Sequence, residues 1–271
     1  IPIQLGLKRR NMWQGNGKER MHHSWRYACP NATTAGSEVS EMTTAQLPWL
    51  SIIVPTLNEA TQLRQTLAEL QSWRARGVEI IVVDGGSSDA TAVIAKSIAD
   101  KVLVSSKGRA RQMNQGAVHA RGKTLLFLHA DTQLTSTALV ALQQLLSTKP
   151  EAWGRFDVRI DGRSAMFAVI AWFMNQRSRW THISTGDQAQ FFSRDLFYRV
   201  GKFPVQPLME DIEICRRTKR ILKPDSLRQK VTTSGRRWER YGVWRTIGLM
   251  WSLRYRYWRG VPASVLAKAY R

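Results

Sequence analysis

The segment TLLFLHADT at residues 124–132 constrains the fold more than any other part of the chain. A nearly unbroken apolar run of this length is typical of a strand buried on both faces, as in a parallel sheet covered by helices. The run leads to one carboxylate, Asp131. Because ligands bind such sheets just beyond the carboxyl ends of the strands, Asp131 is expected where chemistry takes place. Three interpretations remain open: Asp131 holds a divalent cation that binds a diphosphate, caps the helix expected from Thr135, or makes an Asx turn.

The first half of the chain alternates between strand and helix patterns. Apolar runs predict strands at 50–54, 79–83 and 102–105 before the strand that leads to Asp131. Helices are expected up to about residue 74, over 90–99, from about residue 108 and over 135–147. This order predicts an α/β fold whose mostly parallel, Rossmann-like sheet has right-handed crossovers and is flanked by helices.

The second half changes character. Residues 153–160 predict a strand whose alternation leaves the face of Arg155, Asp157 and Arg159 wetter. Further elements are expected as a helix at 164–179, a short strand at 189–192, a helix at 209–220, an edge strand at 231–234 and a last helix at 243–256.

Composition divides the chain into three parts. Residues 1–47 are polar, so we expect a disordered leader. Because they begin with Ile1 rather than Met, the alternative is that this leader is not native coding sequence but upstream sequence included in error. Residues 48–240 form the expected α/β domain. Residues 241–271 form a basic, aromatic helical tail packed on or beside that domain.

The net charge of +21 favours anionic partners. From residue 216 to residue 271 there are sixteen Lys or Arg against two acidic residues, interleaved with Trp and Tyr. That pattern fits nucleic acid or a helix on a membrane surface, and we expect an anionic membrane and no nucleic acid. Two cysteines fit a reducing compartment, and no apolar run reaches the ~20 residues of a membrane span. We therefore expect a cytoplasmic protein, peripheral on the inner face of the membrane.

Seven motifs occur together in one order. They are SIIVPTLNEA at 51–60, IIVVDGGSSDAT at 80–91, GRARQMNQGA at 108–117, LLFLHADT at 125–132, GDQAQFF at 186–192, MEDIE at 209–213 and SGRRW at 234–238. Over about residues 49–240 the chain resembles glycosyltransferase family 2, the inverting sugar transferases of the GT-A fold. It is most similar to a small subgroup associated with radical-SAM and selenium genes and named arsenosugar-biosynthesis glycosyltransferases.

The resemblance implies a role for each matching residue. The family's Asp-x-Asp metal motif reads His129-Ala130-Asp131 here, so Asp131 is the implied ligand of Mg²⁺ or Mn²⁺. The family's Glu-Asp pair matches Glu210 and Asp211, with Asp211 as the catalytic base. The SGRRW segment resembles a shortened Gln-x-x-Arg-Trp motif, and its missing Gln argues against polymer synthesis. The implied residues that bind the nucleotide sugar are Pro55, Asn58, Glu59, Asp84, Arg109, Asp131, Arg236, Arg237 and Trp238.

The chemistry also follows from residue types. A cation on Asp131, helped by Arg236 or Arg237, would offset the charge that develops on a leaving diphosphate. A carboxylate such as Asp211 can accept the proton of an attacking hydroxyl, with Glu213 as a weaker rival. One base and no second carboxylate nucleophile predict inversion at the sugar C1. Together with the resemblance, this implies transfer from a nucleoside-diphosphate sugar, expected to be UDP-linked, to a hydroxyl of a small-molecule or lipid acceptor.

Two alternatives compete with this function. A nucleotidyltransferase of similar fold would need a Gly-rich, phosphate-binding loop near the first strand, which PTLNEA lacks. A basic module that binds nucleotide or membrane without transferase activity would show salt-sensitive binding and no reaction. His129 fits a structural role better than metal or phosphate contact, because the histidines show no metal-ligand spacing.

Overall fold

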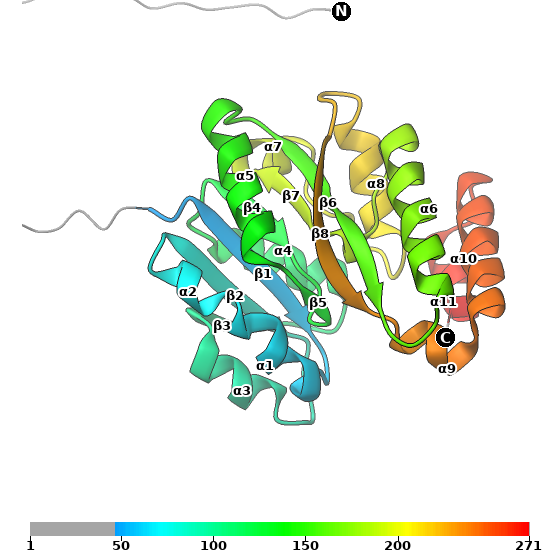
Figure 1. Ribbon diagram of the computed structural model, residues 1–271, viewed down its shortest axis with the longest axis horizontal. Coiled ribbons are helices and arrows are strands. Elements are labelled where there is room, and N and C mark those ends of the chain that lie inside the picture. Colours follow the sequence, from blue (N-terminus) through cyan, green and yellow to red (C-terminus); the bar gives the residue numbers. More distant parts are fainter. Residues whose placement is uncertain (1–46, 271) are drawn as a thin grey trace, which may run out of the picture. The chain divides into compact units, whose positions relative to one another are not determined.

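The computed structural model describes residues 47–270, so the leader expected at 1–47 lies, apart from Leu47, outside the described residues. Four parallel strands form the first half of the sheet, in the order β3-β2-β1-β4 (Figure 1). β2 and β4 are buried along their whole length and β1 at every residue except Pro55, as their apolar runs predict. The strands are β1 (Leu50–Thr56), β2 (Val78–Asp84), β3 (Lys101–Val104) and β4 (Thr124–Phe127).

The sheet continues with strands of mixed direction. β7 (Gln190–Ser193) runs antiparallel to β4, and β6 (Trp153–Asp161) is antiparallel to β7. The remaining strands are β8 (Asp225–Ser234) and the short β5 (Thr132–Gln133), and the full order is β3-β2-β1-β4-β7-β6-β8-β5. The prediction of an edge strand at 231–234 was wrong, because β8 is longer and lies between β6 and β5.

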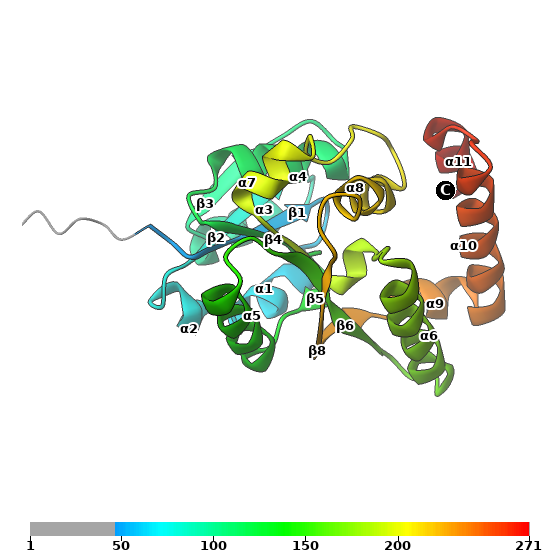
Figure 2. The same cartoon turned by 90° about the horizontal axis from the view of Figure 1, so that it is seen from above.

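Alternate residues of the central strands pack into two apolar clusters, one on each face. On one face Ile52 and Val54 pack with α1 (Ala60–Ala68), α2 (Gln71–Arg74), α3 (Thr91–Ile98), α5 (Ser136–Thr148) and α6 (Met166–Thr181). On the other, Ile53 and Phe127 pack with α4 (Arg109–His119), α7 (Arg194–Arg199) and α8 (Glu210–Thr218). Figure 2 shows α1 and α5 on one side of the sheet and α4 and α7 on the other. The parallel sheet covered by helices is confirmed.

Two local predictions were wrong. The first strand does not end at residue 54 as predicted: β1 continues to Thr56, and Pro55 pairs with Val83 of β2. Pairing of β1 with β4 stops at Ile53, so β1 has no paired strand on that side at Pro55. Proline lacks a backbone N–H, and here no ladder hydrogen bond is lost for want of it. In β6, Arg155 and Asp157 are buried rather than exposed to solvent. Only the end of the strand, residues 158–161, shows the expected alternation of buried and exposed side chains.

Three helices follow β8: α9 (Arg236–Tyr241), α10 (Val243–Trp258) and α11 (Ala263–Tyr270), of which only α10 was predicted. Leu253 of α10 and Leu266 of α11 are buried in one apolar cluster with Met209 and Ile212 at the start of α8. The C-terminal helices therefore pack next to the segment that carries the Glu-Asp pair. Between residues 47 and 270, no helix combines the length and the apolar character needed to cross a bilayer.

Candidate active site

The carboxyl ends of β1, β2 and β4 meet at one edge of the sheet. Asp84 is the last residue of β2 and is paired with Thr56 of β1. Its carboxylate accepts hydrogen bonds from the backbone N–H groups of Gly86 (3.0 Å) and Ser87 (2.8 Å) and from the Ser87 hydroxyl (2.5 Å). Asp84 therefore first holds its own Gly-rich loop in place, which fixes the shape of the edge.

Asn58 ties the loop after β1 to the loop after β2. Its backbone adopts a left-handed conformation with φ of 56°. Its N–H donates to the Ser87 hydroxyl (2.9 Å), and its side-chain oxygen accepts from the N–H of Ser88 (2.9 Å). Below these loops Gln112 of α4, which sequence analysis did not single out, donates to the carbonyls of Thr56 (2.8 Å) and Val83 (2.9 Å). Two strand ends and two loops are thus joined into one rigid rim.

Glu59, Asp131 and Arg236 converge at this rim. The Nη2 of Arg236 lies 3.1 Å from a Glu59 oxygen and 3.4 Å from an Asp131 oxygen. The Arg236 side chain is 48% exposed, so its guanidinium is able to leave these carboxylates for a ligand. The structure thus brings together three of the predicted residues across sequence separations of 177 and 105 positions.

The capping interpretation of Asp131 was wrong. Helix α5 is capped by Thr135, whose side chain accepts the N–H of Ala138 at 3.3 Å. The carbonyl of Asp131 accepts the N–H of Ser234, which joins the end of β8 to the rim. The Asp131 carboxylate is therefore directed to Arg236 and is not used by the following helix.

Arg109, Glu210 and Asp211 line one small pocket beside the rim, together with Met113, Phe127, His129, Gly186, Gln190 and Phe203. Glu210 is buried, and an oxygen of its carboxylate lies 3.5 Å from Nη1 of Arg109. The Asp211 carboxylate accepts the N–H of Gly186 at 3.0 Å. The rival base Glu213 instead pairs with Arg217 (3.2 Å) on the same helix and is absent from this pocket lining.

Burial raises the pKa of Asp211 to about 6, and the negative charge of Glu210 adds to the rise. The hydrogen bond from Gly186 and the charge of Arg109 oppose the rise. A carboxylate with a pKa near 6 is ionised at neutral pH and still basic enough to take a proton in a reaction. Asp211 is therefore suited to act as a general base.

His129 holds the loop that faces Asp211. Its Nδ1 lies 3.2 Å from a carboxylate oxygen of Asp187, and its side chain is 13% exposed. A side chain at Gly186 would place its Cβ 2.3 Å from His129 Nε2, so only glycine fits there. The GDQ segment stands out in the sequence as part of a motif, but the sequence carries no signal for a separate role of Gly186 or Asp187. These contacts link Asp211 to the end of β4 and so to the rim around Asp131.

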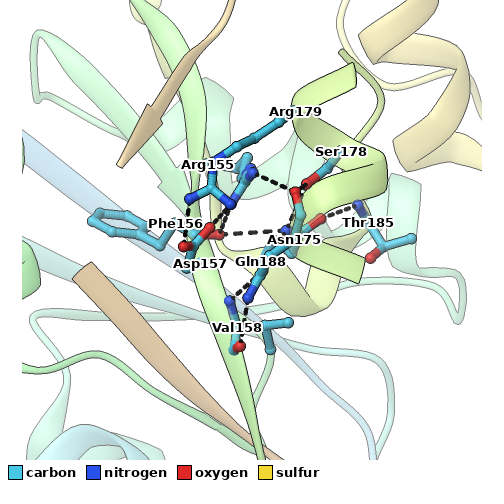
Figure 3. A network of polar contacts seen from close by, with 9 residues as sticks. All are labelled: Arg155, Phe156, Asp157, Val158, Asn175, Ser178, Arg179, Thr185 and Gln188. Carbon is cyan, nitrogen blue, oxygen red and sulfur yellow. Dashed lines mark hydrogen bonds and ion pairs between the residues drawn. The ribbon is translucent and has the colours of Figure 1, made fainter. Parts of the chain in front are cut away.

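A buried polar network supports the same loop from below (Figure 3). Gln188 donates to the Ser178 hydroxyl (3.1 Å) and to the side-chain oxygen of Asn175 (3.3 Å). Asn175 in turn exchanges two hydrogen bonds with the backbone of Val158 in β6. Asp157 pairs with Arg155 and Arg179, which explains why this part of β6 is buried. The network fixes α6 and the Gly186–Gln188 turn to the sheet.

Arg237 and Trp238 do not join the Glu59–Arg236–Asp131 group. The Arg237 guanidinium stacks 3.8 Å from the Tyr270 ring centroid and donates to the Tyr270 carbonyl at 3.2 Å. Trp238 packs, partly buried, against the main apolar cluster. Both side chains therefore fasten α9, and Arg236 alone of the three reaches the rim.

The residues at the rim fit a divalent cation that is shared with a substrate. Among residues 47–270 there is no group of three or more His, Cys, Asp or Glu side chains that would hold a metal ion by itself. Mg²⁺ is commonly bound by one or two carboxylates together with substrate phosphates. Asp131, with Glu59 next to it, supplies that kind of incomplete oxygen set.

Comparisons with known proteins agree with this description. A family model described as "Glycosyl transferase family 2" matches residues 51–205. An uncharacterised glycosyltransferase of Mycobacterium tuberculosis is 28% identical over 191 residues, which cover 67% of this chain and 72% of that protein. The GalNAc(5)-diNAcBac-PP-undecaprenol beta-1,3-glucosyltransferase of Campylobacter jejuni is 32% identical over 106 residues, 36% of this chain and 34% of that protein.

Two solved structures share the fold. S. aureus TarS 1–349 in complex with UDP-GlcNAc superimposes with a TM-score of 0.55 at 18% identity, over 68% of this chain and 58% of that one. The mannosyltransferase PcManGT from Pyrobaculum calidifontis, in complex with GDP-Man and Mn²⁺, has a TM-score of 0.52 at 20% identity, over 69% and 57%. The chain spans less than two thirds of the length of either structure. The similarity to both structures confirms the predicted GT-A fold.

Proposed function

The chain belongs to glycosyl transferase family 2 and is a glycosyltransferase, and from this we propose that it transfers a sugar with inversion from a nucleoside-diphosphate donor to a hydroxyl acceptor. The observation that carries the proposal is Asp211, a carboxylate of raised pKa in a pocket next to the strand ends where the donor would bind. No second carboxylate in that pocket is free to act as a nucleophile, because Glu210 is buried against Arg109. A single displacement therefore explains the site best.

In the proposed reaction Asp211 accepts the proton of the acceptor hydroxyl while the acceptor oxygen bonds to the sugar C1. The bond from C1 to the phosphate oxygen breaks, and its electron pair leaves with the diphosphate. Arg236, now paired with Glu59 and Asp131, is the candidate to contact the leaving diphosphate. Mg²⁺ or Mn²⁺ held by Asp131 would, when bound, add Lewis-acid charge to the same oxygens. Asp84, Asn58 and their loops would shape the nucleotide pocket.

The donor is proposed to be UDP-linked, since TarS is a fold neighbour solved with UDP-GlcNAc. The acceptor is proposed to be a small molecule or a lipid-linked hydroxyl, because the Campylobacter jejuni relative is named for a polyprenol-linked acceptor. An anionic membrane surface would be the matching partner. The arsenosugar subgroup rests on motif resemblance, and transfer to an arsenic-containing acceptor would test it. A basic module without transferase activity is set aside because the family is one of transferases.

The test is a transfer assay with UDP-glucose, UDP-GlcNAc and GDP-mannose, each with Mg²⁺, with Mn²⁺ or with EDTA. We expect turnover of one UDP-sugar, loss of turnover with EDTA, and a product of inverted anomeric configuration by NMR. Asp131→Ala should abolish turnover, and Asp211→Asn should keep donor binding but lose transfer. Glu213→Gln is the matched control, because this carboxylate lies on the same helix but pairs with Arg217. Retention of configuration, or full activity of Asp211→Asn, would refute the mechanism.

A further inference from the structure

Helix α10 carries a continuous aromatic face that points to solvent. Trp244, Trp251, Tyr255 and Trp258 are 74%, 76%, 58% and 73% exposed. At about 100° per residue these four side chains fall within about 60° of one another around the helix. Thr246 and Leu253, on the opposite side, are buried. The helix is therefore already packed through its other face, and its aromatic face has no partner among the described residues.

The neighbouring helix α6 has an exposed apolar face of the same kind. Val169, Trp172, Phe173 and Trp180 recur at helical spacing and are 44%, 53%, 60% and 78% exposed. Both views place α6 and α10 side by side (Figures 1 and 2). Residues of both helices also belong to one apolar cluster. Large apolar patches of this kind on a folded protein usually mark an interaction surface.

The charge around these helices selects the partner. Neither α6 nor α10 contains an Asp or Glu, and no acidic residue follows Glu239 in the chain. Arg245 and Arg259 are exposed next to the aromatic face of α10. Tryptophan and tyrosine rings flanked by arginine suit the boundary between headgroups and acyl chains, and the arginines attract anionic lipid. An acidic protein partner would account for the basic residues, but it would not account for the row of solvent-exposed tryptophan side chains.

We propose that the exposed aromatic faces of α6 and α10 form a docking surface for an anionic phospholipid membrane. α10 packs through Leu253 against the start of α8, the helix that carries Asp211, so docking would hold the pocket close to the bilayer. In this respect the proposal rests on the proposed function, because such an arrangement serves an enzyme whose acceptor hydroxyl belongs to a lipid.

The test is cosedimentation of the full chain with vesicles of phosphatidylglycerol and phosphatidylcholine, without donor or acceptor, so that its result does not depend on transferase activity. We expect binding that weakens with salt and that falls at least tenfold with vesicles of phosphatidylcholine alone. The variant Trp244→Ser/Trp251→Ser/Trp258→Ser should lose binding at least tenfold while keeping its Tm within about 2 °C, because each of these side chains is more than 70% exposed.

The matched control replaces three exposed valines on other helices, Val93→Ser/Val118→Ser/Val140→Ser, and should bind vesicles like the parent chain. Equal vesicle binding by the tryptophan variant and the parent would overturn the proposal, as would no binding by the parent. Sedimentation velocity tests the other occupant: a parent dimer that becomes a monomer in the tryptophan variant, together with no vesicle binding, would assign the surface to a second copy of the chain. Failure of vesicle binding with intact transfer would remove this proposal only.

Discussion

The replacement Asp211→Asn tests the proposed base most directly. Asparagine keeps the size of the side chain and an oxygen that can accept the N–H of Gly186, now 3.0 Å away, but it cannot take a proton. General-base catalysis usually contributes about 10²–10⁴-fold to the rate. We therefore expect kcat to fall by about 10²–10⁴-fold while donor affinity, measured by calorimetry with UDP, changes less than about twofold.

The pH dependence of the parent enzyme gives a second readout. With a pKa of about 6, Asp211 is mostly ionised at pH 7 and mostly protonated at pH 5. The rate of the chemical step should fall about tenfold between these pH values, whereas a carboxylate of ordinary pKa, about 3.9, would leave it almost unchanged. Initial rates in a buffer of constant ionic strength measure this. A flat profile from pH 5 to pH 8 would refute the assignment of Asp211 as the base.

The same raised pKa predicts an opposite effect on stability. Because the folded protein binds the Asp211 proton more tightly than the unfolded chain, this carboxyl group favours folding at low pH, and that advantage is lost as the pH rises through about 6. Above pH 7 the ionised, buried group therefore costs up to about 3 kcal/mol. Asp211→Asn should melt at a higher temperature than the parent at pH 8, and the difference should vanish near pH 4. A lower Tm of the variant at pH 8 would contradict the burial of a charged group here.

Four further substitutions test the site and the fold that supports it. Gly186→Ala should displace His129, which should lower kcat at least tenfold and the free energy of unfolding by about 1–3 kcal/mol. Gly248→Ala is the comparison: this glycine lies in α10 with open space around it, so the substitution should raise the free energy of unfolding by about 0.5–1 kcal/mol in thermal melts. Arg236→Gln should raise the KM for the donor about tenfold in steady-state kinetics. Burial raises the pKa of Glu79, but the hydrogen bonds from Ser51 and Arg121 outweigh burial, so the pKa is lowered. Glu79→Gln should therefore reduce the free energy of unfolding by about 1–3 kcal/mol in denaturant unfolding at pH 7. This difference should shrink as the pH falls through the lowered pKa.

The central sheet was predictable because each buried strand carries its own signal. Ile52 to Val54, Ile80 to Val83 and Leu125 to Phe127 are apolar on both faces, and such runs alternating with helix patterns are typical of a parallel sheet covered by helices. Once the sheet is parallel, its carboxyl edge follows, and with it the neighbourhood of Asp84 and Asp131. The rim of the site was therefore within reach of sequence analysis.

The supports of the site were not predictable, because they depend on contacts that leave no periodic signal. The alternation predicts that Arg155 and Asp157 face solvent, and their burial is explained only by the pairing of Asp157 with both Arg155 and Arg179. Gly186 reads as an ordinary turn residue until His129 is placed against it. The strand order in the second half of the sheet was also not predictable. β8 has a mixed burial pattern, and its position between β6 and β5 depends on long-range pairing.

The candidate site extends beyond the end of the family match. Residues 51–205 include Glu59, Asp84 and Asp131, which surround the proposed donor position. Asp211 and Arg236 lie beyond residue 205, on α8 and α9, and α8 packs against the C-terminal helices. The family match therefore covers the strand ends of the rim, whereas Asp211 and Arg236 come from a part of the chain outside it. A chimera that exchanges residues 206–224 for the corresponding part of a relative should keep the donor preference, because Arg236 and the rim stay unchanged, and should change the acceptor, because Asp211 on α8 is in the exchanged part.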